Sequence, residues 1–219
     1  ENALRTLTPF YRGVLHFIVR EEVDIAQIQD LRGKTVAWGH DGSGSRPITE
    51  KLLSHFEISQ DEVDLKPMAI EEACEALHAG EIDALLLMLG LHSETVHQLA
   101  QKRGIRFVPI GEAIDEGSEI DGFRLRYPFA QGYLIPTYAY ASQTPTEVGV
   151  PEEPIAALSI QTLLFCREDL PVHIARDITR IIHQNRSTLL QKHPSAAQIT
   201  EDFDRNGLQF PIHKGAEQY

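Results

Sequence analysis

Residues 34–110 alternate between short apolar runs and amphipathic stretches, and this alternation limits the chain to a few architectures. Four runs have the length and apolar character of strands: 34–38, 63–67, 82–89 and 105–110. Three stretches between them carry apolar residues at helical spacing: 47–56, 70–80 and 93–102. The pattern predicts an α/β fold with an open sheet covered by helices. The almost wholly apolar run at 82–89 is expected to be a parallel strand buried on both faces.

The segments on either side of this region predict further elements. Before it we expect a strand at 4–10, a turn at 11–13, a strand at 14–20 and a short helix at 25–31. After it we expect an exposed loop, a strand, a long helix that begins at Pro171, a final helix and an irregular tail: 142–154, 158–166, 171–189, 194–203 and 207–219.

Composition narrows the classes of protein that fit. A chain of 219 residues forms one large domain or two small lobes. Its 20 basic and 32 acidic residues give a formal net charge of −12, which argues against a nucleic-acid partner. The longest apolar run, Ala84–Leu89, is far shorter than the roughly 20 residues of a transmembrane helix. Two cysteines are too few for a disulfide framework.

The strand at 34–38 runs into a loop, Gly39–Arg46, that contains three glycines and two serines. In an open α/β sheet, ligands bind beyond the carboxyl ends of the strands, where this loop lies. Backbone amides near the start of a helix suit a carboxylate or phosphate, and an arginine adds a charge-assisted bond. We therefore identify five candidate ligand-binding residues here: Gly42, Ser43, Gly44, Ser45 and Arg46. The alternative is a plain connection in which Ser43 or Ser45 caps the helix.

A second candidate surface lies in an aromatic and hydroxyl cluster. Tyr133, Thr137, Tyr138 and Tyr140 either line a ligand cleft or pack in the core. The histidines lack metal-ligand spacing, so neither a metal nor another cofactor is expected. The Gly-x-Ser-x-Gly motif of hydrolases is absent, although a catalytic triad that uses Ser43 is left open because triads assemble in space.

Several motifs, in order along the chain, together resemble the TAXI-type solute receptors of TRAP transporters, which are type II periplasmic binding proteins. The segments that carry the resemblance are Leu15–Arg20, Leu31–Ser45, Ala76–Ala84, Ile135–Tyr138, His193–Pro194 and Pro211–Ala216. Ser45 stands where the family usually has threonine, and Ile135–Tyr138 lacks a glycine that the family carries. The resemblance covers essentially the whole chain.

This resemblance implies a two-lobed, Venus-flytrap receptor that is not an enzyme. One lobe would comprise residues 1–31 and 160–219, and the other residues 32–159. The family has a longer N-terminal segment that forms the facing wall of the cleft, so the first lobe is expected to be incomplete. The implied ligand is an amino acid or organic acid, held by its carboxylate at Gly42–Arg46 with Thr137 and Tyr138 lining the pocket. The implied place is the periplasm or another extracytoplasmic space, with or without a membrane anchor, and the implied partners are membrane transporter subunits or that anchor.

Two other functions remain open from the sequence. The first is a ligand-sensing domain of a membrane signalling protein. The second is a hydrolase that uses the Gly42–Ser45 loop.

Overall fold

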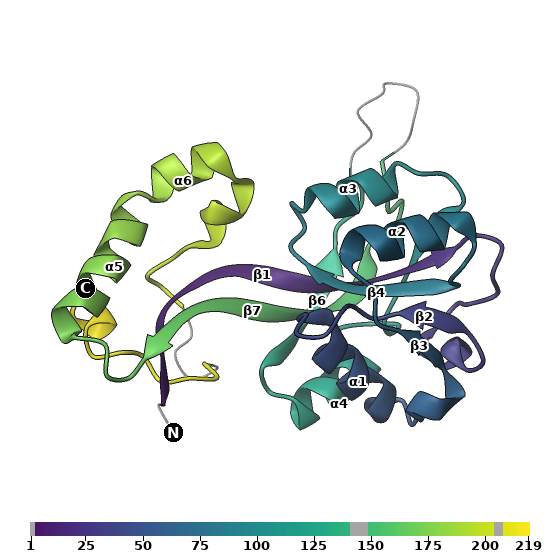
Figure 1. The fold of residues 1–219 in the computed structure, drawn as a ribbon, viewed down its shortest axis with the longest axis horizontal. Coiled ribbons are helices and arrows are strands. Elements are labelled where there is room, and N and C mark those ends of the chain that lie inside the picture. Colours follow the sequence, from purple (N-terminus) through teal and green to yellow (C-terminus); the bar gives the residue numbers. More distant parts are fainter. Residues whose placement is uncertain (1–2, 141–148, 204–207) are drawn as a thin grey trace. The chain divides into compact units, whose positions relative to one another are not determined.

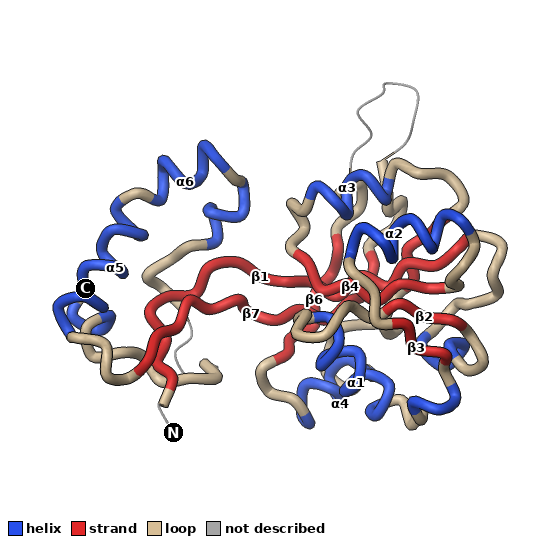
Figure 2. The backbone as a smooth tube through the Cα atoms, in the orientation of Figure 1, coloured by secondary structure: helices blue, strands red, loops and turns tan. Residues whose placement is uncertain are grey.

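The computed structural model describes residues 3–140, 149–203 and 208–219 (Figure 1). Residues 142–148 of the expected loop and residue 207 of the expected tail lie outside this range. The chain divides into two compact units: unit 1 comprises residues 1–13 and 160–219, and unit 2 comprises residues 14–159. Two strands, β1 (Leu4–Arg20) and β7 (Ile155–Arg167), continue from one unit into the other (Figure 2). The assignment of residues 1–31 and 160–219 to one lobe and 32–159 to the other stays a prediction.

The sheet is mixed, with the strand order β3-β2-β4-β1-β7-β6 and with β5 also paired to β1. The remaining strands are β2 (Thr35–Ala37), β3 (Asp64–Lys66), β4 (Ala84–Leu89), β5 (Ile105–Val108) and β6 (Ala130–Ile135). β2 runs parallel to both β3 and β4, whereas β1 runs antiparallel to β4 and β5. The α/β class predicted from the alternation is confirmed, and β4 has one parallel and one antiparallel neighbour.

Four helices cover the sheet of unit 2: α1 (Ser45–His55), α2 (Ile70–Ala79), α3 (Glu94–Ala100) and α4 (Glu119–Arg126). Helices α2 and α3 lie on one face, and α1 and α4 lie on the other (Figure 1). His55 connects α1 with α4, because its Nε2 lies 3.1 Å from the carbonyl oxygen of Glu119 and its ring packs against Phe123. With both faces covered, residues 84–87 of β4 are at most 1% exposed, as the apolar run predicted.

Other parts of the described chain form short 3₁₀ turns. They are η1 (Ile28–Leu31), η2 (Gln60–Glu62), η3 (Pro194–Gln198) and η4 (Ala216–Gln218). The predicted helix at 25–31 is thus reduced to η1, and the predicted final helix to η3. In η3 the imidazole Nδ1 of His193 accepts a hydrogen bond from the amide of Ser195 and caps the start of the turn.

The turn predicted at 11–13 is wrong, because residues 4–20 form one continuous strand. A hairpin would need its two halves to pair with each other, and here each half has a different partner. Val14–Val19 pairs with β4, whereas Thr6 forms a bridge with Ile212 near the C-terminus. Gly13 therefore stays extended within the strand.

The long helix predicted from Pro171 is divided in two. Helix α5 (Val172–Gln184) begins after Pro171, and α6 (Arg186–Lys192) follows after Asn185. The side-chain amide of Asn185 donates to the carbonyl oxygen of Ile181 at 2.8 Å, a local bond of the kind that ends a helix. In the part of the chain that the structure describes, no helix has the length and apolar character required to cross a membrane.

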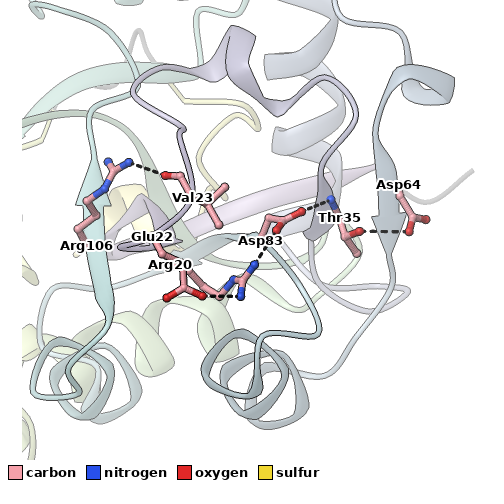
Figure 3. A network of polar contacts seen from close by, with 7 residues as sticks. All are labelled: Arg20, Glu22, Val23, Thr35, Asp64, Asp83 and Arg106. Atoms are coloured by element: carbon pink, nitrogen blue, oxygen red, sulfur yellow. Dashed lines mark hydrogen bonds and ion pairs between the residues drawn. The ribbon is translucent and has the colours of Figure 1, made fainter.

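At the end of the sheet where β2 and β4 begin, Asp83 joins three strands through one carboxylate (Figure 3). Its Oδ1 pairs with Arg20 Nη2 at 3.0 Å, and its Oδ2 accepts the amide of Thr35 at 2.9 Å. The amide of Asp83 donates to Thr35, and the carbonyl oxygen of Asp83 accepts from Arg20. Arg20 also pairs with the exposed Glu22. The Ile-Asp-Ala segment therefore has a structural role here.

We expect Asp83→Asn to destabilise the protein by about 1–2 kcal/mol, because it removes the charged partner of Arg20 and weakens the acceptor for Thr35. Glu22→Gln is the matched control, since it removes the other, exposed partner of Arg20 and should change stability by less than about 0.5 kcal/mol. Urea unfolding followed by circular dichroism measures both. Equal effects of the two substitutions would contradict the assigned role of Asp83.

In unit 1, the segment 210–216 lies along the first residues of β1. Thr6 exchanges backbone hydrogen bonds with Pro211 and His213, at 2.8 and 2.9 Å, and its hydroxyl donates to Phe210. The buried imidazole of His213 accepts the amide of Gly215 at 3.0 Å. Gly215 itself packs against α5 so closely that a Cβ would lie 2.2 Å from the carbonyl oxygen of Val172.

We expect Gly215→Ala to destabilise unit 1 by about 1–3 kcal/mol, because the added methyl group overlaps the backbone of α5. Lys214→Ala changes an exposed neighbour and should stay within about 0.5 kcal/mol of the original chain. Hydrogen exchange of the amides in α5 locates the effect. Unchanged protection of α5 in Gly215→Ala would show that this close packing is not needed.

Candidate functional site

The loop between β2 and α1 folds back on itself at two left-handed glycines. Gly39 has φ +90° and Gly42 has φ +82°, which side chains rarely tolerate. The amide of Ser43 donates to the carbonyl oxygen of His40 at 3.0 Å and closes the turn. A Cβ on Gly39 would lie 2.2 Å from Ser43 Oγ, so the serine hydroxyl rests directly over this glycine. The amide of Ser43 is therefore used within the loop, whereas its hydroxyl has no hydrogen-bond partner among the described residues.

Helix α1 begins directly after the loop, and its N-terminus lacks a side-chain cap. Gly44 is the N-cap residue, and neither Ser43 nor Ser45 caps the helix. The backbone N–H groups of Gly44, Ser45 and Arg46 find no acceptor among the residues that the structure describes. Such N–H groups carry the positive end of the helix dipole and favour an anion.

Two buried polar atoms at the same loop also lack a partner within the described ranges. They are Nε1 of Trp38, whose residue is 5% exposed, and Oγ of Ser43. A buried donor without an acceptor destabilises a fold by about 1–3 kcal/mol, so such atoms are rare unless a bound group completes them. Trp38 therefore joins the candidate residues, although the sequence did not single it out.

Arg46 is already paired with neighbouring carboxylates. It forms ion pairs with Asp41 and with Glu50 Oε1, the latter at 3.5 Å from its Nε, and its guanidinium lies 4.7 Å from the centre of the Trp38 ring. The Asp41 side chain is 86% exposed, and an ion pair this exposed contributes little. An anion at the loop would thus compete with Asp41 for Arg46 at small cost.

Ser45 is connected to the interior of unit 2. Its Oγ, in a residue only 4% exposed, accepts the amide of Met88 on β4 at 2.9 Å. The carbonyl oxygen of Leu87 belongs to the same peptide group and lies 3.3 Å from Nδ1 of His16 on β1. Nε2 of His16 is in turn hydrogen-bonded to the hydroxyl of Tyr140. Burial lowers the pKa of His16 to about 4 and raises the pKa of Tyr140, so both groups are neutral at pH 7.

Only part of the aromatic and hydroxyl cluster lies at the surface of the protein. Thr137 and Tyr138 lie in a turn that is closed by a hydrogen bond of 3.1 Å from the amide of Ala139 to the carbonyl oxygen of Pro136. Tyr138 is 53% exposed with φ +58°, a strained conformation of the kind found at functional sites. Within the described residues, no hydrogen bond or ring contact joins Thr137 or Tyr138 to the loop at 39–46. Tyr140 is 1% exposed and packs in the core, against Phe107 and His97.

His16 makes stability depend on pH, because a buried neutral imidazole cannot take the proton that the unfolded chain binds. Between pH 6.5 and pH 4 the unfolded state binds one more proton at this residue than the folded state does, so stability falls as pH falls. Between pH 7 and pH 4.5 the free energy of unfolding should therefore decrease by about 2–3 kcal/mol less in His16→Gln than in the original protein. Urea unfolding of both proteins at the two pH values measures this difference. The contribution of the carboxylates cancels, because they titrate in both proteins. Identical pH dependence would contradict a buried neutral His16.

The chain belongs to the NMT1-like family, whose model matches residues 1–219. Solved structures that are similar to part of this chain include the periplasmic aliphatic sulphonate binding protein SsuA from Escherichia coli, with 18% identity and a TM-score of 0.42 over 49% of this chain and 36% of that one. An amino acid ABC transporter substrate-binding protein from Streptococcus pneumoniae, bound to L-arginine, has 13% identity and a TM-score of 0.45 over 91% and 63% of the two chains. A mutant of ArgBP from T. maritima has 15% identity and a TM-score of 0.45 over 86% and 61%. The chain spans between 36% and 63% of the length of these three structures.

Proposed function

We propose that this chain is part of an extracytoplasmic solute receptor that binds a small anionic organic molecule, an amino acid or an organic acid, at the loop 39–46. The observation that carries the proposal is the set of unpaired groups at this loop. The amides of Gly44, Ser45 and Arg46 and the indole N–H of Trp38 are all donors without an acceptor among the described residues. Membership of the NMT1-like family and the likeness of several motifs to TAXI-type receptors support the receptor class.

An anion fits these donors better than a neutral solute does. Hydrogen bonds from neutral donors to a charged acceptor each contribute about 1.5–3 kcal/mol, roughly twice the value for a neutral acceptor. The start of α1 adds a favourable dipole. The formal net charge of −12 acts at longer range and is screened over about 8–10 Å at physiological salt. The local donors therefore outweigh the distant charge.

Each predicted residue has a distinct part in this proposal. Gly42 gives the loop its left-handed turn, Ser43 offers its hydroxyl, Gly44 offers its amide, and Ser45 offers both its amide and its hydroxyl. Arg46 exchanges Asp41 for the ligand. Thr137 and Tyr138 are proposed to contact the remainder of the solute. In this proposal the protein is not an enzyme, acts in the periplasm or another extracytoplasmic space, and delivers its ligand to the membrane subunits of a TRAP-type transporter.

Trp38 makes the proposal directly testable, because it is the only tryptophan of the chain and lies at the loop. We expect at least one amino acid, dicarboxylate, keto acid or alkanesulfonate to change the tryptophan fluorescence in a saturable way. The same compound should raise the thermal midpoint, since a ligand at 100 times its Kd adds about 2.7 kcal/mol of stability. Ser43→Ala and Ser45→Ala should each weaken binding by about ten-fold.

Ser54→Ala is the control, because it makes the same substitution at an exposed position near the other end of α1. It should leave the affinity unchanged. A solute that binds equally well to all three serine variants would place the site elsewhere. Turnover of an ester that is lost in Ser43→Ala would instead support a hydrolase.

A further inference from the structure

Three hydrogen bonds link the core of unit 2 to the proposed anion site. We call this set the Tyr140–Ser45 chain; it consists of Tyr140, His16, the peptide group between Leu87 and Met88, and Ser45. Tyr140 and His16 are 1% and 0% exposed, and Ser45 is 4% exposed. Water therefore does not compete for these bonds, and each group must be satisfied by its neighbours.

Elementary hydrogen-bond chemistry fixes the direction of the chain. A carbonyl oxygen only accepts, so the proton of the imidazole must lie on Nδ1, which faces Leu87. The ring is neutral, which leaves Nε2 bare and makes the Tyr140 hydroxyl the donor to it. At the other end, the amide of Met88 can only donate, and Ser45 Oγ accepts from it. Every donor in the chain therefore points toward Ser45.

The consequence for Ser45 is that its own hydroxyl proton is left to donate outward. No acceptor for this proton is found in the residues that the structure describes. Successive bonds that point in one direction polarise each other, which makes the last hydroxyl a stronger donor. The neighbouring unpaired amides and the Trp38 indole are also donors and cannot accept.

We propose that His16 and Tyr140 are positioning residues that hold Ser45 as a donor and thereby restrict the loop to a terminal group that only accepts hydrogen bonds, a carboxylate or sulfonate. The inference rests on the proposed function and adds the chemical class that the loop accepts. A primary amide or a sulfonamide has nearly the same shape, but its N–H groups would face these donors. Such a mismatch leaves donors of both partners unpaired and weakens binding by about ten-fold or more.

The first experiment examines the chain without any ligand. Nitrogen NMR of histidine-labelled protein distinguishes the two neutral tautomers, and His16→Gln identifies the signal of His16 among the ten histidines. We expect a neutral imidazole with its proton on Nδ1 at pH 6–8. In Tyr140→Phe the Nε2 signal should move to the position of an unbonded nitrogen, while the tautomer is kept by Leu87. A proton on Nε2 would overturn the proposal.

The second experiment measures discrimination through Trp38 fluorescence. The probes are acetate against acetamide, and methanesulfonate against methanesulfonamide, at neutral pH and constant ionic strength. We expect each anion to bind about ten-fold or more tightly than its amide. Tyr140→Phe should reduce this ratio by about three-fold, and His16→Phe should reduce it further, whereas His16→Gln restores part of it because the amide can both donate and accept.

Tyr127→Phe is the matched control, since Tyr127 packs on Phe123 and lies outside the chain of hydrogen bonds. It should leave the ratio unchanged, whereas a general structural effect would lower it in both tyrosine variants and contradict a positioning role. Equal binding of anion and amide would overturn the inference and leave the proposed receptor function intact. If neither probe nor any solute of the screen bound, the proposed function itself would be wrong at this loop.

Discussion

The pairing of β1 with β4 is the constraint on which the rest of unit 2 depends. Its antiparallel register sets His16 opposite Leu87 and Phe17 opposite Leu86, with both faces of the pair buried. A shift of one residue would turn every side chain of β1 to the other face of the sheet. The Leu87–Met88 peptide group would then lose its hydrogen bond to His16. Ser45 would remain bonded to a peptide group that has no hydrogen bond to the core. The register of one strand pair thus determines the polar arrangement at the start of α1.

The loop after β2 departs from the rules that the rest of the fold follows. Asp83 and the buried His213 show the usual pattern, because their polar groups are paired with neighbouring groups. At the loop, Trp38 Nε1 and Ser43 Oγ are buried without partners, and two glycines are held in left-handed conformations. Unsatisfied donors gathered in one place are typical of sites that a ligand completes. The surrounding sheet, covered by helices on both faces, provides the stability that this arrangement requires.

Much of the fold could be predicted because it depends on local periodicity. The runs that became β2, β3, β4 and β5 were found within one or two residues of their bounds, and so were the helices between them. The two main failures have different causes, one in long-range pairing and one in a local bond. The expected turn at 11–13 is absent because the two halves of β1 pair with strands that are distant in the sequence. The break at Asn185 depends on one side-chain bond that periodicity does not report.

For the candidate site, the sequence by itself determined the place and the type of residue: a glycine-rich loop between a strand and a helix. Only the tertiary structure decided which polar groups remain free. In the structure the amide of Ser43 donates to the carbonyl oxygen of His40, and Trp38 is buried. Ser45 is connected to Tyr140 by successive hydrogen bonds whose partners are 43, 71 and 124 positions apart in the sequence. The physical reason is that the neighbours of a hydrogen-bonding group in space decide whether it is paired or unpaired. Sequence spacing does not show which residues become neighbours at such separations.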